Sequence, residues 1–373
     1  MIKTTCRFLV SLAILSALTF AGGGCRPGQG GHGGPPLQSM PEGTPDAHGR
    51  PLWADEMPVL APVALGQGEK LKVVASTSIV ADVVQQVGGE RIALIALMPL
   101  GADPHAFEPA PRDAAAVADA HVVFVNGMGL EVFLEKLFQS AGEGVTVVPV
   151  SYGIEPLRFE EEGVHGEAEG DHHGEAEGDH HGEAEGDHHG EDEGDHYGEA
   201  DPHTWFDPHN VIVWTRNIAH ALGALDPPNA QAYQASAAAY EAELRELDAW
   251  IREQIARLPE GKRRLVTDHA SFGYFARRYG FAQVGTLFPG YSTLAEPSAQ
   301  DLAALEDAIR ALDVPAVFVG LTVNPGLAER VAEDTGTRLV FLYTGSLSAP
   351  GGPADDYISF MRYNVSAIVE ALR

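Results

Sequence analysis

The sequence has few cysteines, few basic residues and no long apolar run. Its 373 residues contain only Cys6 and Cys25, and Cys6 lies in a stretch that we expect to be removed on export, so no internal disulfide can form. The 24 Lys and Arg residues face 53 Asp and Glu residues, which gives a net charge of −29. The sequence thus lacks the basic patch that nucleic-acid binding needs, whereas 45% hydrophobic residues are enough for buried cores.

The N-terminus has the pattern of an export signal. Lys3 and Arg7 precede an apolar run at residues 8–21, which is short for a membrane span, and Gly22-Gly23-Gly24-Cys25 follows. This ending resembles the bacterial lipobox, which implies that Cys25 becomes an acylated N-terminus; the alternative is an incidental cysteine near an ordinary cleavage site. We therefore expect a lipoprotein-type signal peptide at 1–25 and a Gly- and Pro-rich flexible tether at 26–69. The protein would lie in the periplasm or on the outer face of the cell membrane.

A repeated segment holds much of the charge. Three copies of GEAEGDHH and a fourth, GEDEGDHY, fill residues 166–197, and residues 160–201 contain 18 of the 53 acidic residues but no Lys or Arg. Without this segment the net charge would be −11 instead of −29. Imidazoles with carboxylates favour weak capture of zinc, copper or nickel, although a solvated acidic linker is the alternative. We expect residues 160–201 to be a disordered loop. The histidines of the repeats are His172, His173, His180, His181, His188, His189 and His196.

Short apolar strands alternate with helical patterns on both sides of this segment. Expected strands lie at 71–77, 92–98, 121–126 and 145–150, and again at 265–268, 283–288, 317–320 and 339–343. Such alternation predicts two α/β lobes, each a parallel sheet flanked by helices. We place an N-terminal metal-binding lobe at 70–159 and 202–227, and a C-terminal lobe at 259–373. Between them, residues 228–258 lack internal Gly and Pro, which predicts one long rigid helix of roughly 45 Å at 1.5 Å per residue.

Three histidines outside the repeats stand where α/β folds place ligand-binding loops. His105 and His269 each follow a predicted strand, and His203 precedes a predicted helix. Ligands bind at the carboxyl ends of strands in open α/β sheets. A single histidine at a strand end is usually structural, but three of them on two facing lobes favour metal ligation. His209, close to His203 in the sequence, is a candidate auxiliary ligand.

The order of motifs resembles the zinc and manganese substrate-binding proteins of ABC importers. The motifs are GADPHAFEP (101–109), the acidic His-rich insertion, DPHTWFDP (201–208), TDHASFGYFARRYG (267–280) and GSLSAPGGPADDYISFMRYN (345–364). The resemblance covers residues 70–373 and implies that His105, His203 and His269 are the metal ligands. It also implies capture of the ion between two lobes, delivery to a membrane permease and no enzymatic activity; we expect a monomer.

The resemblance places the fourth ligand of the family at Gly345, which has no side chain. A water, Asp355, Asp356 or a histidine of the repeats would then complete the coordination. Manganese members resemble this layout but use two histidines and two carboxylates. The imidazole-rich set here favours Zn²⁺ over Mn²⁺. Asp103 and Asp201 each stand two residues before a ligand histidine, where either a hydrogen bond to that ligand or a turn cap is expected.

Two other function classes remain open from the sequence. Three histidines with one free position also describe a zinc-dependent hydrolase, although the chain contains no HExxH motif. A hydrolase needs a site open to its substrate, whereas a carrier buries its ion. A surface adhesin or passive metal store would instead use the repeats as its functional part, and would hold several ions with similar affinity.

Overall fold

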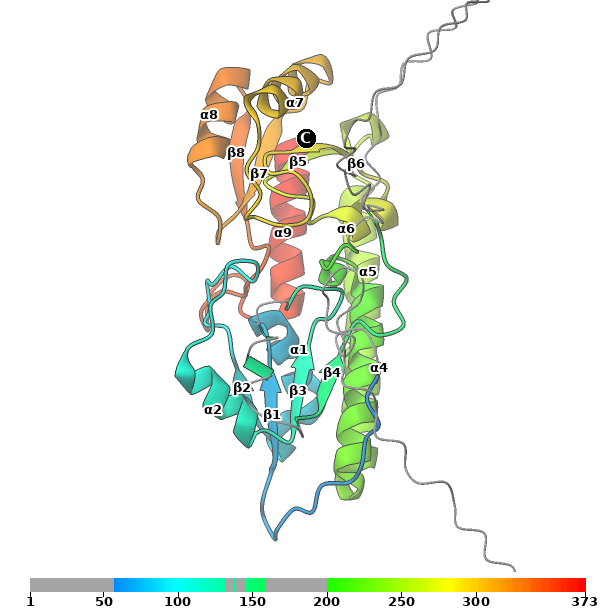
Figure 1. Ribbon diagram of the computed structural model, residues 1–373. Helices are drawn as coiled ribbons and strands as arrows, with labels where there is room; N and C mark the ends of the chain where they lie inside the picture. Colours follow the sequence, from blue (N-terminus) through cyan, green and yellow to red (C-terminus); the bar gives the residue numbers. More distant parts are fainter. Residues whose placement is uncertain (1–56, 132–133, 135–136, 139–144, 159–199) are drawn as a thin grey trace, which may run out of the picture. The chain divides into compact units, whose positions relative to one another are not determined.

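The computed structural model describes residues 57–131, 134, 137, 138, 145–158 and 200–373. These residues form two parallel four-stranded sheets with the strand orders β2-β1-β3-β4 and β6-β5-β7-β8 (Figure 1). In each sheet the chain starts on an inner strand, moves to one edge and crosses back past its start to the other edge. The predicted class, two α/β lobes each with a parallel sheet flanked by helices, is confirmed.

The first lobe is built on valine-rich strands. β1 pairs with β2 with Leu71 opposite Ile92, and all four residues of β3 are buried, as expected for a strand that is covered on both faces. The side chain of Thr77 accepts a hydrogen bond from the backbone N–H of Val80 and caps α1. The elements of this lobe are β1 (Leu71–Ala75), α1 (Ser78–Gly88), β2 (Ile92–Ala96), α2 (Pro111–Asp119), β3 (Val122–Val125), β4 (Val147–Pro149), the 3₁₀ turn η4 (Thr204–Phe206) and α4 (Pro208–Leu225).

The second lobe repeats the alternation of strand and helix. β7 pairs with β8 with Ala316 opposite Arg338, and Ser298 begins α7 with a capping box that it forms with Asp301. Its elements are β5 (Arg264–Thr267), α6 (Gly273–Tyr279), β6 (Ala282–Thr286), α7 (Ala299–Ala311), β7 (Ala316–Gly320), α8 (Gly326–Thr335), β8 (Arg338–Leu342) and α9 (Tyr357–Leu372).

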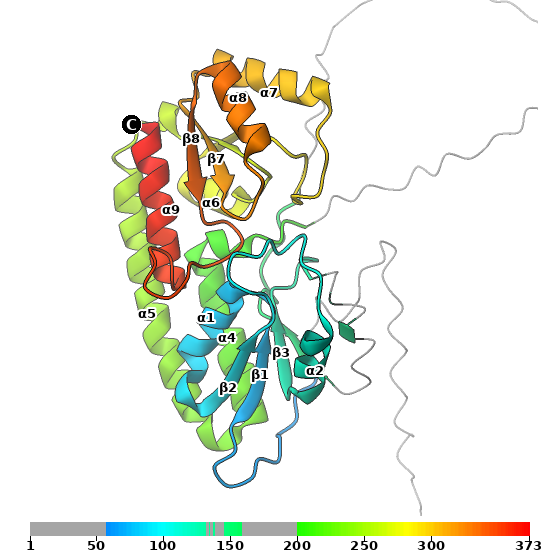
Figure 2. The same ribbon diagram turned by 90° about the vertical axis from the view of Figure 1, so that its left-hand side faces the viewer.

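One long helix, α5 (Ala230–Ile255), follows α4 and packs against helices of both lobes. Along its length it contacts α1 and α4 of the first lobe and α9 of the second (Figure 1 and Figure 2). It has 26 residues and is shorter than the predicted range of 228–258, because Pro227–Asn229 forms a 3₁₀ turn before it and the chain leaves the helix ahead of Pro259.

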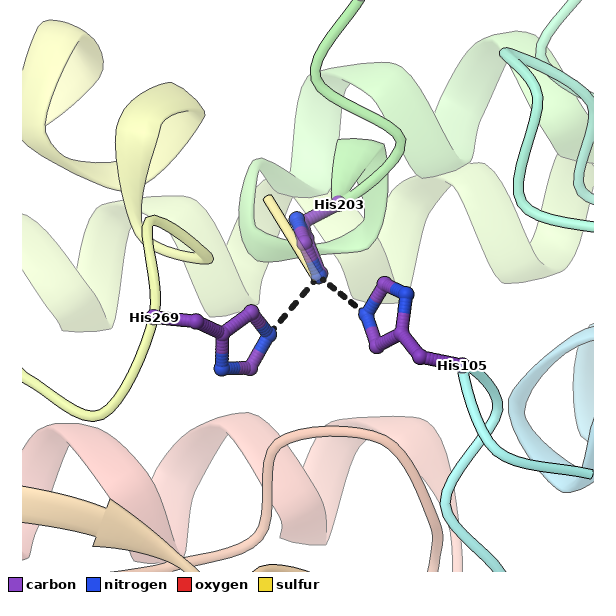
Figure 3. Close-up of side chains that lie close together, drawn as sticks. All are labelled: His105, His203 and His269. Carbon is purple, nitrogen blue, oxygen red and sulfur yellow. Dashed lines mark hydrogen bonds between the residues drawn. The ribbon is translucent and has the colours of Figure 1, made fainter. Parts of the chain in front are cut away.

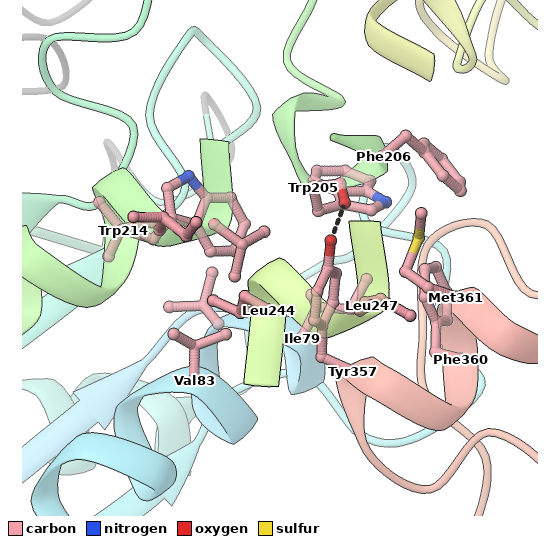
Figure 4. Packing of buried hydrophobic residues seen from close by; sticks show 14 of the residues in the cluster. Ile79, Val83, Trp205, Phe206, Trp214, Leu244, Leu247, Tyr357, Phe360 and Met361 are labelled. Carbon is pink, nitrogen blue, oxygen red and sulfur yellow. Dashed lines mark hydrogen bonds between the residues drawn. The ribbon is translucent and has the colours of Figure 1, made fainter. Parts of the chain in front are cut away.

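The largest hydrophobic core is continuous from one lobe to the other. It joins residues of β1 and α1 to residues of α5, α6 and α9. Figure 4 shows Leu244 and Leu247 of α5 between α1 and the start of α9, where the hydroxyl of Tyr357 donates a hydrogen bond to the backbone oxygen of Trp205 at 2.7 Å. The two sheets are therefore joined by packed side chains as well as by the chain itself.

Several predicted segments lie outside the described residues. They are the signal peptide with Cys25, the first part of the tether, and the repeats with His172, His173, His180, His181, His188, His189 and His196. Residues 57–69, the last part of the predicted tether, lie against the body, because Met57, Leu60, Val63 and Leu65 pack on the large core. None of the helices in the described part of the chain is long and apolar enough to span a membrane.

Candidate metal centre

The three predicted histidines meet at one point. His105 comes from the loop after β2, His203 stands directly before η4, and His269 follows β5 (Figure 3). The Nε2 atom of His203 lies 3.1 Å from Nε2 of His105 and 3.0 Å from Nε2 of His269. One nitrogen from each ring lies within 4.8 Å of the other two, a spacing that a single metal ion can bridge. Among the described residues, these three form the only such cluster.

The centre is enclosed by protein. His203 and His269 are 1% and 3% exposed and His105 is partly buried, and the three rings line a small pocket of about 190 Å³. Trp205 and three threonines from the second lobe line it beside the rings: Thr293, Thr322 and Thr344. A small pocket lined by three ring nitrogens suits a bound ion.

Asp201 holds His203 in place. Its Oδ1 lies 2.8 Å from the ring Nδ1 of His203 and accepts the backbone N–H of the same residue at 2.9 Å. With Nδ1 engaged, the ring directs Nε2 toward the other two histidines, as carboxylates do in many histidine–metal sites. Asp201 makes both contacts that were expected of it, one with the ligand ring and one with the backbone as a turn cap.

Asp268 does the same for His269, and we did not predict it. Its Oδ1 lies 2.7 Å from the ring Nδ1, and its Oδ2 accepts the backbone N–H of Gly320 at 2.6 Å. A side chain at Gly320 would collide with the hydroxyl of Thr344 and come within 3.0 Å of Asp268 Oδ2. The signal was local, since Asp268 directly precedes the ligand histidine in the sequence.

Asp103 contacts the backbone of His105 and not its ring. Its Oδ1 accepts the N–H of His105 at 2.9 Å, and its Oδ2 accepts a hydrogen bond from Thr293 Oγ1 at 2.6 Å. The turn-cap role is the one that the structure shows here. His105 therefore differs from the other two ligands, since no hydrogen bond to its Nδ1 is found within the described part of the chain.

Burial keeps the imidazoles of His105 and His203 uncharged. It lowers the pKa of His105 to about 3, and it lowers the pKa of His203 well below its usual range, with the neighbouring histidines adding to both shifts. Neutral imidazole is the form that binds metal. Burial also raises the pKa of Asp201, whereas for Asp268 the contacts with His269 and Gly320 outweigh burial and lower the pKa. A bound cation would offset the cost of burying these carboxylates.

The other expected ligands lie elsewhere. Asp356 caps α9 by accepting the N–H of Ser359, and Asp355 accepts the N–H of Gly351, so neither joins the cluster. Asp356 satisfies a free N–H group at the start of the helix, as capping residues do. His209 also lies outside the cluster: its side chain is half exposed, and its Nε2 lies 3.8 Å from Oδ2 of Asp248.

Gly345 lines the pocket but leaves no space for a fourth ligand side chain. A Cβ atom at this position would lie 2.5 Å from Cδ of Pro104, the residue before His105. The loop that carries His105 occupies the place where a carboxylate from residue 345 would begin. The protein thus offers three nitrogen ligands and no oxygen ligand from this segment.

Two α/β lobes around a buried cluster of imidazoles define a class of metal-binding proteins that hold one ion between parallel sheets. Residues 73–371 match the family described as "Zinc-uptake complex component A periplasmic". The chain belongs to this family, and it is an extracytoplasmic metal-binding protein of the kind that serves ABC importers.

Relatives support the same family and differ in the metal they are named for. The chain is 34% identical to the manganese-binding lipoprotein MntA of Halalkalibacterium halodurans, over 82% of this chain and 89% of that protein. It is 31% identical to the iron-binding protein YfeA of Yersinia pestis, over 81% and 86% of the two chains. The structure of the periplasmic zinc-binding protein TroA from Treponema pallidum superposes with a TM-score of 0.68 at 26% identity, covering 82% of this chain and 99% of that one.

Proposed function

We propose that the protein captures one Zn²⁺ ion between its lobes and delivers it to the membrane permease of an ABC importer. The observation that carries this proposal is the convergence of three Nε2 atoms, from His105, His203 and His269, in one buried place. Two of the rings are oriented by aspartates at their Nδ1 atoms. A carrier needs this enclosure, because its cargo must stay bound during transit.

The ligand set is the basis for choosing zinc. Neutral imidazole suits Zn²⁺, which takes four nitrogen or sulfur ligands in tetrahedral geometry, while Mn²⁺ is better served by oxygen. Three imidazoles and one water would complete such a sphere, with no carboxylate from position 345. Copper would bind the same nitrogens tightly, so its exclusion depends on geometry and supply. Because the named relatives bind manganese, iron or zinc, family membership alone does not choose the metal.

Other parts of the chain fit the same function. An acylated Cys25 would tether the protein to the membrane beside its permease, consistent with the lipoprotein names of several relatives. The repeats at 166–197 would collect zinc ions weakly and raise their concentration near the tight site. We propose a monomer that is not an enzyme.

A metal titration of the metal-free protein tests the proposal. We expect one Zn²⁺ bound far more tightly than Mn²⁺, measured by competition with chelators of known affinity. Substitution of His105, His203 or His269 by Ala should weaken zinc binding by at least about tenfold, which corresponds to about 1.4 kcal/mol. Undiminished affinity in all three variants would refute the site. Several ions of equal affinity and no tight one would instead indicate a metal store.

His269→Glu separates the choice of metal from the existence of the site. Glutamate exchanges one nitrogen ligand for oxygen, so the ratio of zinc affinity to manganese affinity should fall. His269→Gln, which has nearly the same size but no charge, is the matched control. An unchanged ratio in the Glu variant would show that the imidazole at this position does not set the preference.

A further inference from the structure

The three histidines of the proposed site are held in different ways. Carboxylates fix the rings of His203 and His269 at Nδ1, from Asp201 and Asp268. His105 receives its support through the backbone of its loop, where Asp103 accepts the N–H of His105. The position of the His105 ring therefore depends on what holds that loop.

The second lobe holds this loop at three places. The hydroxyl of Thr293, between β6 and α7, donates to Asp103 Oδ2 at 2.6 Å. Gly101, which has a φ of 80°, donates its N–H to Ser346 Oγ at 2.8 Å. Pro104 packs against Gly345, where any side chain would displace it. Of these contacts, only the one from Thr293 reaches the carboxylate that is bonded to His105.

We infer that Thr293 is a positioning residue for the metal: it links the second lobe, through Asp103, to the placement of His105. The inference depends on the proposed metal site. Asp103 uses one oxygen for each lobe, so it joins Thr293 and His105 within one residue. Loss of this link would release the carboxylate that orients the His105 loop. His105 is then the ligand most directly coupled to release of the ion.

The chemistry at Thr293 makes the link specific. A hydroxyl that donates to a carboxylate forms a charge-assisted hydrogen bond, stronger than one between neutral groups. Valine has the shape of threonine but cannot donate, so Thr293→Val removes the bond and keeps the packing. Serine keeps the hydroxyl, and Thr293→Ser should therefore behave like the natural protein. Thr337 lies outside the pocket, where its hydroxyl forms a hydrogen bond with that of Thr335 at 3.0 Å, and Thr337→Val is a matched control for the loss of a hydroxyl.

The experiment measures zinc dissociation from the whole protein, after mixing with excess chelator. Thr293→Val should release zinc about tenfold faster, the effect of losing a hydrogen bond to a charged group at a partly exposed site. Thr293→Ser and Thr337→Val should release it at nearly the natural rate. Circular dichroism and thermal unfolding of the metal-free variants check that each one is folded.

A second background tests whether Thr293 acts through His105. In a His105→Ala protein, Thr293→Val should have no further effect on the release rate. An equal acceleration with and without His105 would show that Thr293 only holds the lobes together, and would overturn the inference. A natural release rate in Thr293→Val, in a protein that binds zinc tightly, would also overturn it. Absence of tight zinc binding in the natural protein would instead refute the proposed function.

Discussion

Asp268→Asn is the sharpest test of how this centre is built. Asp268 is 1% exposed, and its two oxygens accept three N–H groups: the backbone and the ring Nδ1 of His269 at Oδ1, and the backbone of Gly320 at Oδ2. Asparagine has nearly the same shape but only one acceptor oxygen. Its amide group must therefore face at least one donor.

Either orientation of the new amide has a cost. If its oxygen faces Gly320, the NH₂ group faces Nδ1 of His269, and the ring can accept that hydrogen bond only by moving its own proton to Nε2. This is the atom that points at the other two histidines, and a protonated Nε2 cannot bind metal. If the oxygen faces His269, the buried N–H of Gly320 loses its acceptor, at about 1–3 kcal/mol. We expect zinc affinity to fall by about 10- to 100-fold, typical for carboxylates behind a ligand histidine.

Competition against a zinc-binding dye measures the affinity, and chemical denaturation measures the stability of the metal-free protein. Asp301→Asn is the control, because Asp301 is an exposed capping residue of α7 that accepts hydrogen bonds from Ser298. We expect the control to bind zinc like the natural protein. If Asp268→Asn is folded and binds zinc with undiminished affinity, the orientation of His269 by Asp268 does not contribute to binding.

Two further predictions concern the repeats and one buried carboxylate. Deletion of residues 166–197 should leave the affinity of the tight site nearly unchanged and remove several weaker zinc ions, because a segment with so few apolar residues must lose chain entropy to wrap a metal; loss of the tight site on deletion would show that the repeats supply a primary ligand. Burial raises the pKa of Glu131 from 4.5 to about 7, although a hydroxyl and two backbone N–H groups donate to it. The folded protein thus keeps a proton that the unfolded chain releases, so the free energy of unfolding should decrease by about 3 kcal/mol as pH rises from 4.5 to 7. Glu131→Gln should remove this part of the pH dependence, and parallel stability curves for the two proteins would contradict it.

Much of the fold was predictable because the strands and helices differ in their local patterns. Apolar runs such as Val122–Val125 are buried strands, and the absence of Gly and Pro in α5 fits one unbroken helix. The ends of helices were harder to place, since Pro227–Asn229 forms a 3₁₀ turn where we expected the long helix to begin. A stretch of strong helix formers does not show where tertiary packing ends the regular hydrogen bonding.

The candidate site was predictable only in part. The positions of His105 and His269 after predicted strands indicated that they are ligands, but not how their rings are oriented. The contact between Thr293 and Asp103 joins residues 190 positions apart, and no local pattern predicts it. The capping role of Asp356 was predictable, because Asp356 and Ser359 have the spacing of a capping box, which indicates the start of a helix.

The continuous core has a consequence for how this protein unfolds and how it can be divided. Because α5 packs on helices of both lobes, neither sheet can lose its structure without exposing apolar side chains of the other. Heating should therefore melt both lobes in a single cooperative transition, despite a topology that looks like two domains. Neither half, expressed alone, would keep its share of α5 covered. Chimeric proteins made from two relatives should therefore fold when both lobes come from the same parent, and lose stability when a single lobe is exchanged.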